Sequence, residues 1–164
     1  MAGARDRSLV VLTLELQGES FAIETSQVRE ILDPVPVTAV PGADPTVDGL
    51  INVRGRVVPL ADLRLIFGMP KRDAGIDARI VVIEVNVEGD PTTIGIRADK
   101  VNAVTELAAE SLEATPRIGL RWAPEFIVCM GKRDGDFIAV LDMGRIFSRT
   151  RDRGGAGGQA LAAA

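Results

Sequence analysis

Apolar and polar residues alternate through the first part of the chain. Between residues 9 and 16, leucines occupy every second position from Leu12 onward. This period of two predicts a β-strand with one buried face. Gly18-Glu19 indicates a turn, and Phe21 and Ile23 continue the alternation on a second strand.

A short helix is predicted after this hairpin. Thr25 and Ser26 are residue types that cap helices, and a helix from there through Leu32 would place Val28 and Ile31 on one face with it. Prolines at positions 34 and 36 would end this helix.

A second hairpin is predicted at residues 50–60. Leu50 to Val53 and Arg56 to Leu60 are rich in residues that favour strands, and Arg54-Gly55 between them indicates a tight turn. Asp62 then ends the strand and is predicted to cap a helical turn over residues 63–67.

The second half of the chain repeats the plan of the first half. The matching segments are 9–18 with 80–89, 21–31 with 94–104, and 62–67 with 142–147. Two copies of a unit of about five short strands and one helical turn favour a mainly β protein made of two five-stranded barrels, because closure removes exposed sheet edges. We expect the barrels, at about 9–67 and 80–147, to pack around a shared hydrophobic core within one domain, residues 8–148. Residues 1–7 are predicted to be a flexible arm, and the low-complexity residues 149–164 a disordered tail.

Composition excludes several functions. The chain of 164 residues carries a formal charge of −4, and the basic residues near both ends make the body more acidic than this total. An acidic body with one Trp, five Phe and no Tyr argues against nucleic-acid binding. Since no apolar run is long enough to span a membrane and the N-terminus lacks an apolar export signal, we expect a cytoplasmic protein with no direct membrane insertion.

No catalytic, metal or cofactor motif is found in the sequence. There is no histidine, and Cys129 is the single cysteine, which excludes zinc sites of the usual spacing and predicts a buried structural thiol. Glycine-rich phosphate loops and serine nucleophile motifs are also missing. We therefore expect no enzymatic activity and no cofactor.

The 50–60 hairpin resembles the signature hairpin of the CheW family, the coupling proteins of bacterial chemotaxis. The resemblance rests on Asn52, Arg54, Gly55 and Arg56 at the tip, with Asp62 and Arg64 at the exit of the hairpin. It extends to residues 21–31, 94–101 and 130–143. It implies two SH3-like five-stranded barrels around a shared core. It also implies a non-catalytic adaptor that binds the regulatory domain of the histidine kinase CheA and the cytoplasmic hairpin tip of chemoreceptors, at membrane-associated receptor arrays.

The resemblance also implies a set of coupling residues. The residues that match family positions tied to receptor or kinase coupling are Val28, Glu30, Gly49, Arg54, Ile80 and Val101. We add their neighbours Ile31, Asn52 and Gly55 to this set. We expect the apolar members Val28, Ile31, Ile80 and Val101 to line a receptor groove. From the residues alone, Glu30 and Arg54 could both point to water; the resemblance instead favours an ion pair in which Glu30 holds Arg54 at the edge of the groove.

Two other functions fit parts of the pattern. One is a CheW-like scaffold in a kinase pathway outside chemotaxis, such as surface motility or development. The other is a small-barrel nucleic-acid-binding protein, against which the acidic body argues.

Overall fold

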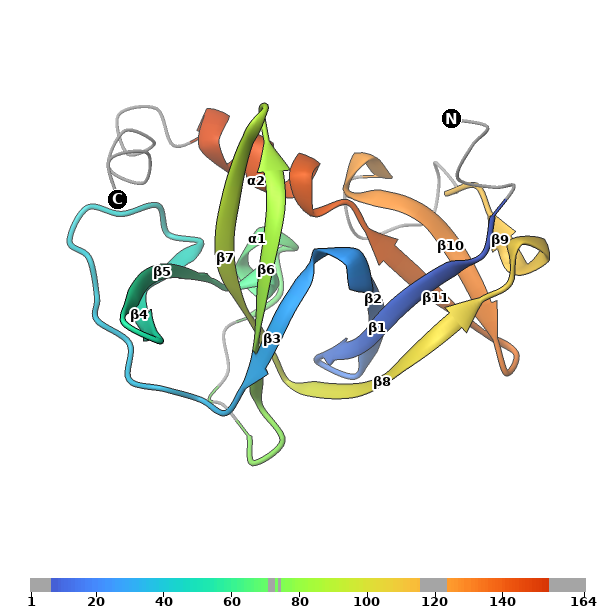
Figure 1. Ribbon diagram of the computed structural model, residues 1–164, viewed down its shortest axis with the longest axis horizontal. Helices are drawn as coiled ribbons and strands as arrows, with labels where there is room; N and C mark the ends of the chain where they lie inside the picture. The colour runs from blue at the N-terminus through green and yellow to red at the C-terminus, as the bar shows by residue number, and fades with distance from the viewer. Residues whose placement is uncertain (1–6, 71–72, 74, 116–123, 154–164) are drawn as a thin grey trace.

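The described residues form two small β-sheets, accompanied by a few short helices (Figure 1). The computed structural model describes residues 7–70, 73, 75–115 and 124–153. The first sheet has six strands in the order β8 (Lys100–Leu107), β1 (Leu9–Leu16), β2 (Glu19–Glu24), β11 (Asp136–Leu141), β10 (Ile127–Arg133) and β9 (Leu112–Glu113). The second has five strands in the order β3 (Val28–Leu32), β6 (Arg79–Val87), β7 (Asp90–Ala98), β5 (Arg56–Ala61) and β4 (Val47–Val53).

Each sheet curls into a barrel. In the six-stranded sheet, β8 continues through the 3-10 turn η3 (Ala109–Ser111) into β9, so one bent segment supplies both edges. In the five-stranded sheet, Thr38 follows β3 and forms a bridge with Leu50 of β4, with both backbone N···O distances at 2.8 Å. These features confirm the predicted mainly β fold of two small barrels. One sheet has six strands instead of the predicted five, because the two-residue strand β9 adds to its edge.

The barrels do not correspond to the two consecutive halves of the sequence. β1 and β2 join the six-stranded sheet with strands of the second half, whereas β3, β4 and β5 share the five-stranded sheet with β6 and β7. The parallel contacts β2–β11 and β5–β7 connect the halves within each sheet. The expected barrel units at 9–67 and 80–147 are therefore wrong, because alternation and turn residues specify hairpins but not which distant hairpins pair.

Residues 25–32 form no α-helix, contrary to the sequence prediction. Thr25–Gln27 is a 3-10 turn, η2, without a side-chain cap, and the Thr25 hydroxyl instead donates to the Val10 carbonyl. The residues that follow form strand β3 on β6. Val28 and Ile31 are β-branched, and backbone pairing with a neighbouring strand outweighs a short helix.

The predicted helical turns at the ends of the two repeats are both present. α1 (Leu63–Ile66) begins at Asp62, whose side chain accepts from the Arg64 N–H as predicted. α2 (Met143–Arg153) is longer than expected and includes residues 149–153, which were assigned to the tail. The rest of the predicted tail, 154–164, and residues 1–6 of the predicted arm lie outside the described residues.

Three hydrophobic clusters form among the described residues. One cluster lies inside the six-stranded barrel and includes Cys129, which is buried as predicted. A second lies inside the five-stranded barrel, and a third, larger cluster contains residues of both sheets and both α-helices. β6 shows how the sequence builds this arrangement, because Val82 packs in its barrel while Val81 and Ile83 pack in the shared core. Two-sided burial explains why β6 is almost continuously apolar.

Candidate functional site

The 50–60 hairpin forms as predicted and presents Arg54 at its tip. Val53 pairs with Arg56, which leaves Arg54 and Gly55 as the two turn residues. Both have positive φ, 52° and 81°, as a type I′ turn requires. The Asn52 side-chain oxygen accepts from the Gly55 N–H at 2.8 Å. Asn52 and Gly55 therefore determine the turn, and the turn places Arg54.

Arg54 forms an ion pair with Glu30, as predicted. Its Nε lies 3.2 Å from Glu30 Oε2 and 3.4 Å from Oε1. The Arg54 side chain is 81% exposed and that of Glu30 is 25% exposed. β3 and β4 are the outer strands of the sheet, so the pair crosses the seam that the Thr38–Leu50 bridge closes.

A register shift in β3 separates Glu30 from its apolar neighbours. Val28 lies opposite Ile83 and Ile31 opposite Val81, and both partners belong to the shared core. Glu30 lies opposite Val82, which packs inside the barrel. The irregularity between Val28 and Glu30 thus leaves Val28 and Ile31 on one face, although the segment is a strand and not the predicted helix. Val28 packs against the shared core, and Ile31 is 44% exposed.

Val101 belongs to the other barrel. It lies on β8 opposite Leu14 of β1 and packs, partly buried, against the same shared core as Val28. Of the residues expected to line the receptor groove, Val28 and Ile31 therefore lie on one barrel and Val101 on the other. The two barrels meet at the shared core.

Ile80 does not line an exposed surface. It is 1% exposed and packs inside the five-stranded barrel, so the expectation that it lines a receptor groove is wrong. Ile80 was misplaced because β6 is apolar on both faces. The sequence therefore does not show which β6 side chains point into the barrel.

Gly49 also has a role inside the fold. A Cβ at this position would lie 2.3 Å from the Thr38 carbonyl oxygen. The glycine lets the segment after β3 approach β4 closely enough to form the closing bridge. Gly49 thus lies at the same seam between β3 and β4 that the Glu30–Arg54 ion pair crosses.

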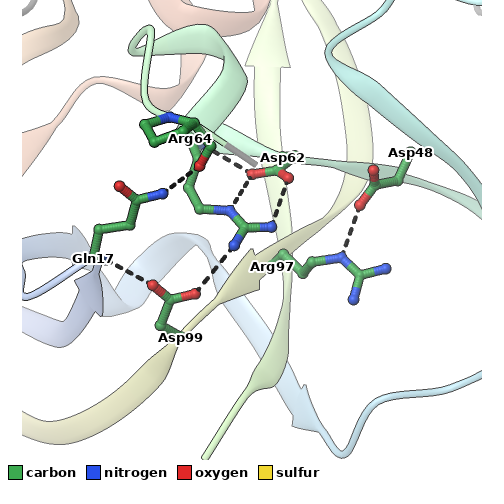
Figure 2. A network of polar contacts seen from close by, with 7 residues as sticks. Gln17, Asp48, Asp62, Arg64, Arg97 and Asp99 are labelled. Carbon is green, nitrogen blue, oxygen red and sulfur yellow. Dashed lines mark hydrogen bonds and ion pairs between the residues drawn. The ribbon is translucent and has the colours of Figure 1, made fainter. Parts of the chain in front are cut away.

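A buried ionic network was not predicted, although Asp62 and Arg64 belong to the residues that carry the family resemblance (Figure 2). Asp62 is fully buried and Arg64 is 3% exposed. Arg64 Nε lies 3.0 Å from Asp62 Oδ1, Nη2 lies 2.9 Å from Oδ2, and Nη1 lies 3.6 Å from Asp99 Oδ1. Nearby, Arg97 Nε lies 2.7 Å from Asp48 Oδ2. The available signal was an Asp-x-Arg pattern directly after a buried strand, but the sequence does not show that Asp99 lies close to it.

The electrostatics of this network hold Arg64 in its charged form. The hydrogen-bonded carboxylate of Asp62 raises the pKa of Arg64, and the charges of Asp99 and Asp48 act in the same direction against the effect of burial. Within the described residues, no group of three or more His, Cys, Asp or Glu side chains could hold a metal ion.

The fold defines a class of protein: a mainly β domain built from two small barrels that share one core. The chain belongs to the CheW family, since residues 10–151 match the family model of the CheW-like domain.

Individual relatives agree with this assignment. The chain is 29% identical over 145 residues to a probable chemotaxis protein CheW of Rhizobium etli. The aligned region covers 88% of this chain and 90% of the relative. It is 28% identical over 137 residues to the chemotaxis protein CheW of Klebsiella aerogenes, covering 84% and 80%. Its structure is similar to the crystal structure of the scaffolding protein TtCheW from Thermoanaerobacter tengcongensis, with a TM-score of 0.75, 26% identity, and coverage of 85% of this chain and 92% of that one.

In the part of the chain that the structure describes, no helix combines the length and apolar character needed to cross a membrane.

Proposed function

We propose that this chain is a non-catalytic adaptor that couples chemoreceptors to a CheA-type histidine kinase. The observation that carries the proposal is the match of residues 10–151 to the CheW-like domain. The names of the relatives, chemotaxis protein and scaffolding protein, agree with this role. The adaptor acts in the cytoplasm, at membrane-associated receptor arrays, and needs no cofactor.

The receptor site in this proposal combines both barrels. Val28 and Ile31 on β3 and Val101 on β8 supply apolar contact at the shared core, and a helix of the receptor hairpin lays its apolar stripe against them. Arg54 lies at the edge of this site and donates charge-assisted hydrogen bonds to the receptor.

The other coupling residues act from inside the protein. Glu30 restrains the Arg54 side chain, Asn52 and Gly55 determine the turn, and Gly49 permits the barrel seam. Ile80 supports the five-stranded barrel through its interior packing.

The proposal is tested by reconstituting the complex. A receptor cytoplasmic fragment is immobilised, and capture of the CheA regulatory domain is measured with and without this chain, using partners from the organism that encodes it. We expect capture of the regulatory domain to increase when the chain is present. Failure of the chain to bind either partner would contradict the proposal.

A further inference from the structure

Buried charge lies where the two barrels meet (Figure 2). Asp62 and Arg64 stand at the start of α1, directly after β5 of the five-stranded sheet. Two guanidinium nitrogens of Arg64 face the two carboxylate oxygens of Asp62, which compensates the charge of a fully buried carboxylate. The third nitrogen, Nη1, points away from Asp62 toward Asp99.

Asp99 connects this pair to the other barrel. It is the residue between β7 of the five-stranded sheet and β8 of the six-stranded sheet. Its Oδ1 lies 3.6 Å from Arg64 Nη1, and its Oδ2 accepts from the Gln17 N–H at 2.6 Å. Its own backbone N–H donates to the Glu15 carbonyl at 3.0 Å.

Gln17 completes the connection. It is a turn residue between β1 and β2, with φ 50°. Its side-chain amide donates to the carbonyl of Pro70, which follows α1 in the chain. Contacts therefore run from the end of β5 through Asp99 to the β1–β2 turn, and from that turn back to the segment after α1.

We propose that Asp99 is a positioning residue that fixes the orientation of the two barrels relative to each other. The shared core holds the barrels together, but apolar burial is non-directional. An ion pair and a hydrogen bond made by the two oxygens of one carboxylate require particular distances and angles. Asp99 thus restricts the orientations that the core alone would allow.

This role has a consequence for the coupling surface. Val28 and Ile31 belong to one barrel and Val101 to the other, so barrel orientation determines how far apart they lie. The consequence for receptor binding rests on the proposed function, whereas the orientation itself is measured without any partner.

The test is a distance measurement between the barrels of the full chain. Spin labels are attached at Val57→Cys on β5 and Asp136→Cys on β11, which are exposed positions in different barrels, and Cys129→Ala removes the native thiol. Pulsed electron paramagnetic resonance then gives the distribution of distances. We expect Asp99→Ala to broaden this distribution and shift its mean relative to the parent chain.

Glu84→Ala is the matched control. It removes an exposed ion pair of 3.0 Å to Arg29 that lies within one barrel, so the distribution is expected to stay unchanged. An unchanged distribution in folded Asp99→Ala overturns the proposal. If circular dichroism shows that Asp99→Ala does not fold, Asp99→Asn decides the question, because it keeps an oxygen for the Gln17 N–H while removing the charge that faces Arg64. An unchanged distribution in that variant also overturns the proposal.

Discussion

Two ion pairs of the same chemical type have different consequences because their exposure differs. The Asp62–Arg64 pair is buried, whereas Arg54 extends into solvent from a turn and meets a partly exposed Glu30. Removing one member of a buried pair leaves an uncompensated charge in the protein interior. Removing an exposed member leaves a group that water can hydrate. We therefore expect Arg64 variants to change stability and Arg54 variants to change binding.

Arg64→Met should destabilise the fold by about 3–5 kcal/mol, because it leaves the buried Asp62 carboxylate without its partner. The measurement is urea unfolding followed by circular dichroism. Arg29→Ala is the control, since it removes an exposed pair whose contribution is about 0–1 kcal/mol. Equal, small losses for both variants would contradict a stabilising role for the buried pair.

Arg54→Ala should weaken receptor binding by about 1–3 kcal/mol through the loss of charge-assisted hydrogen bonds, and should change folding stability little. Glu30→Ala should also weaken binding, and the double variant should lose less than the sum of the single losses because the two residues act as one unit. Isothermal titration with a receptor fragment measures this cycle.

The control for this cycle is Arg29→Ala, an exposed arginine that lies on β3 beside Glu30 and pairs with Glu84. Strictly additive losses would contradict the coupling of Glu30 with Arg54. Unchanged affinity for Arg54→Ala would exclude this turn from the receptor site.

At the scale of elements, the hairpins are predictable from the sequence because their determinants are local. The β1–β2 and β4–β5 turns each place a residue with positive φ before a glycine, Gln17-Gly18 and Arg54-Gly55. β3 is not predictable in this way, because its strand conformation depends on pairing with β6, which is distant in sequence. The same limit explains the error in the barrel units.

The residues of the candidate site differ in the same way, since some of their contacts follow from local sequence and others depend on segments that are distant in the chain. The Glu30–Arg54 pair was predicted because the family resemblance supplied what the local sequence lacks. The Arg64–Asp99 contact depends on two segments that only the tertiary fold brings together, and neither residue carries a local signal of that contact. Ile80 was misplaced because burial on both faces of β6 removes the alternation that would have revealed its direction.

The closing seam of the five-stranded barrel gives an element-scale prediction. Gly49→Ala should destabilise the fold by about 1–3 kcal/mol, because its Cβ would press on the Thr38 carbonyl and force the closing segment away from β4. Thermal unfolding measures the loss. Gly75→Ala is the control, since nothing lies within 4 Å of a Cβ there. A Gly49 variant as stable as the Gly75 variant would show that the seam tolerates the displacement.

At the scale of the whole molecule, the exchange of strands makes the two barrels interdependent. Each sheet takes strands from both halves of the chain, and one apolar core contains residues of both sheets. A surface that spans both barrels is therefore built on one connected unit, in which we propose that Asp99 restricts the barrel orientation. This architecture is compatible with the proposed role of coupling a receptor to a kinase.

The most direct test of the proposed coupling role is kinase control. Autophosphorylation of the CheA-type kinase is measured with a receptor signalling fragment, with and without this chain, and with Arg54→Ala as the variant of the coupling surface. We expect the receptor to change kinase activity only when the chain is present, and Arg54→Ala to reduce this effect. Receptor control of the kinase that is equally strong without the chain would contradict the proposed coupling role.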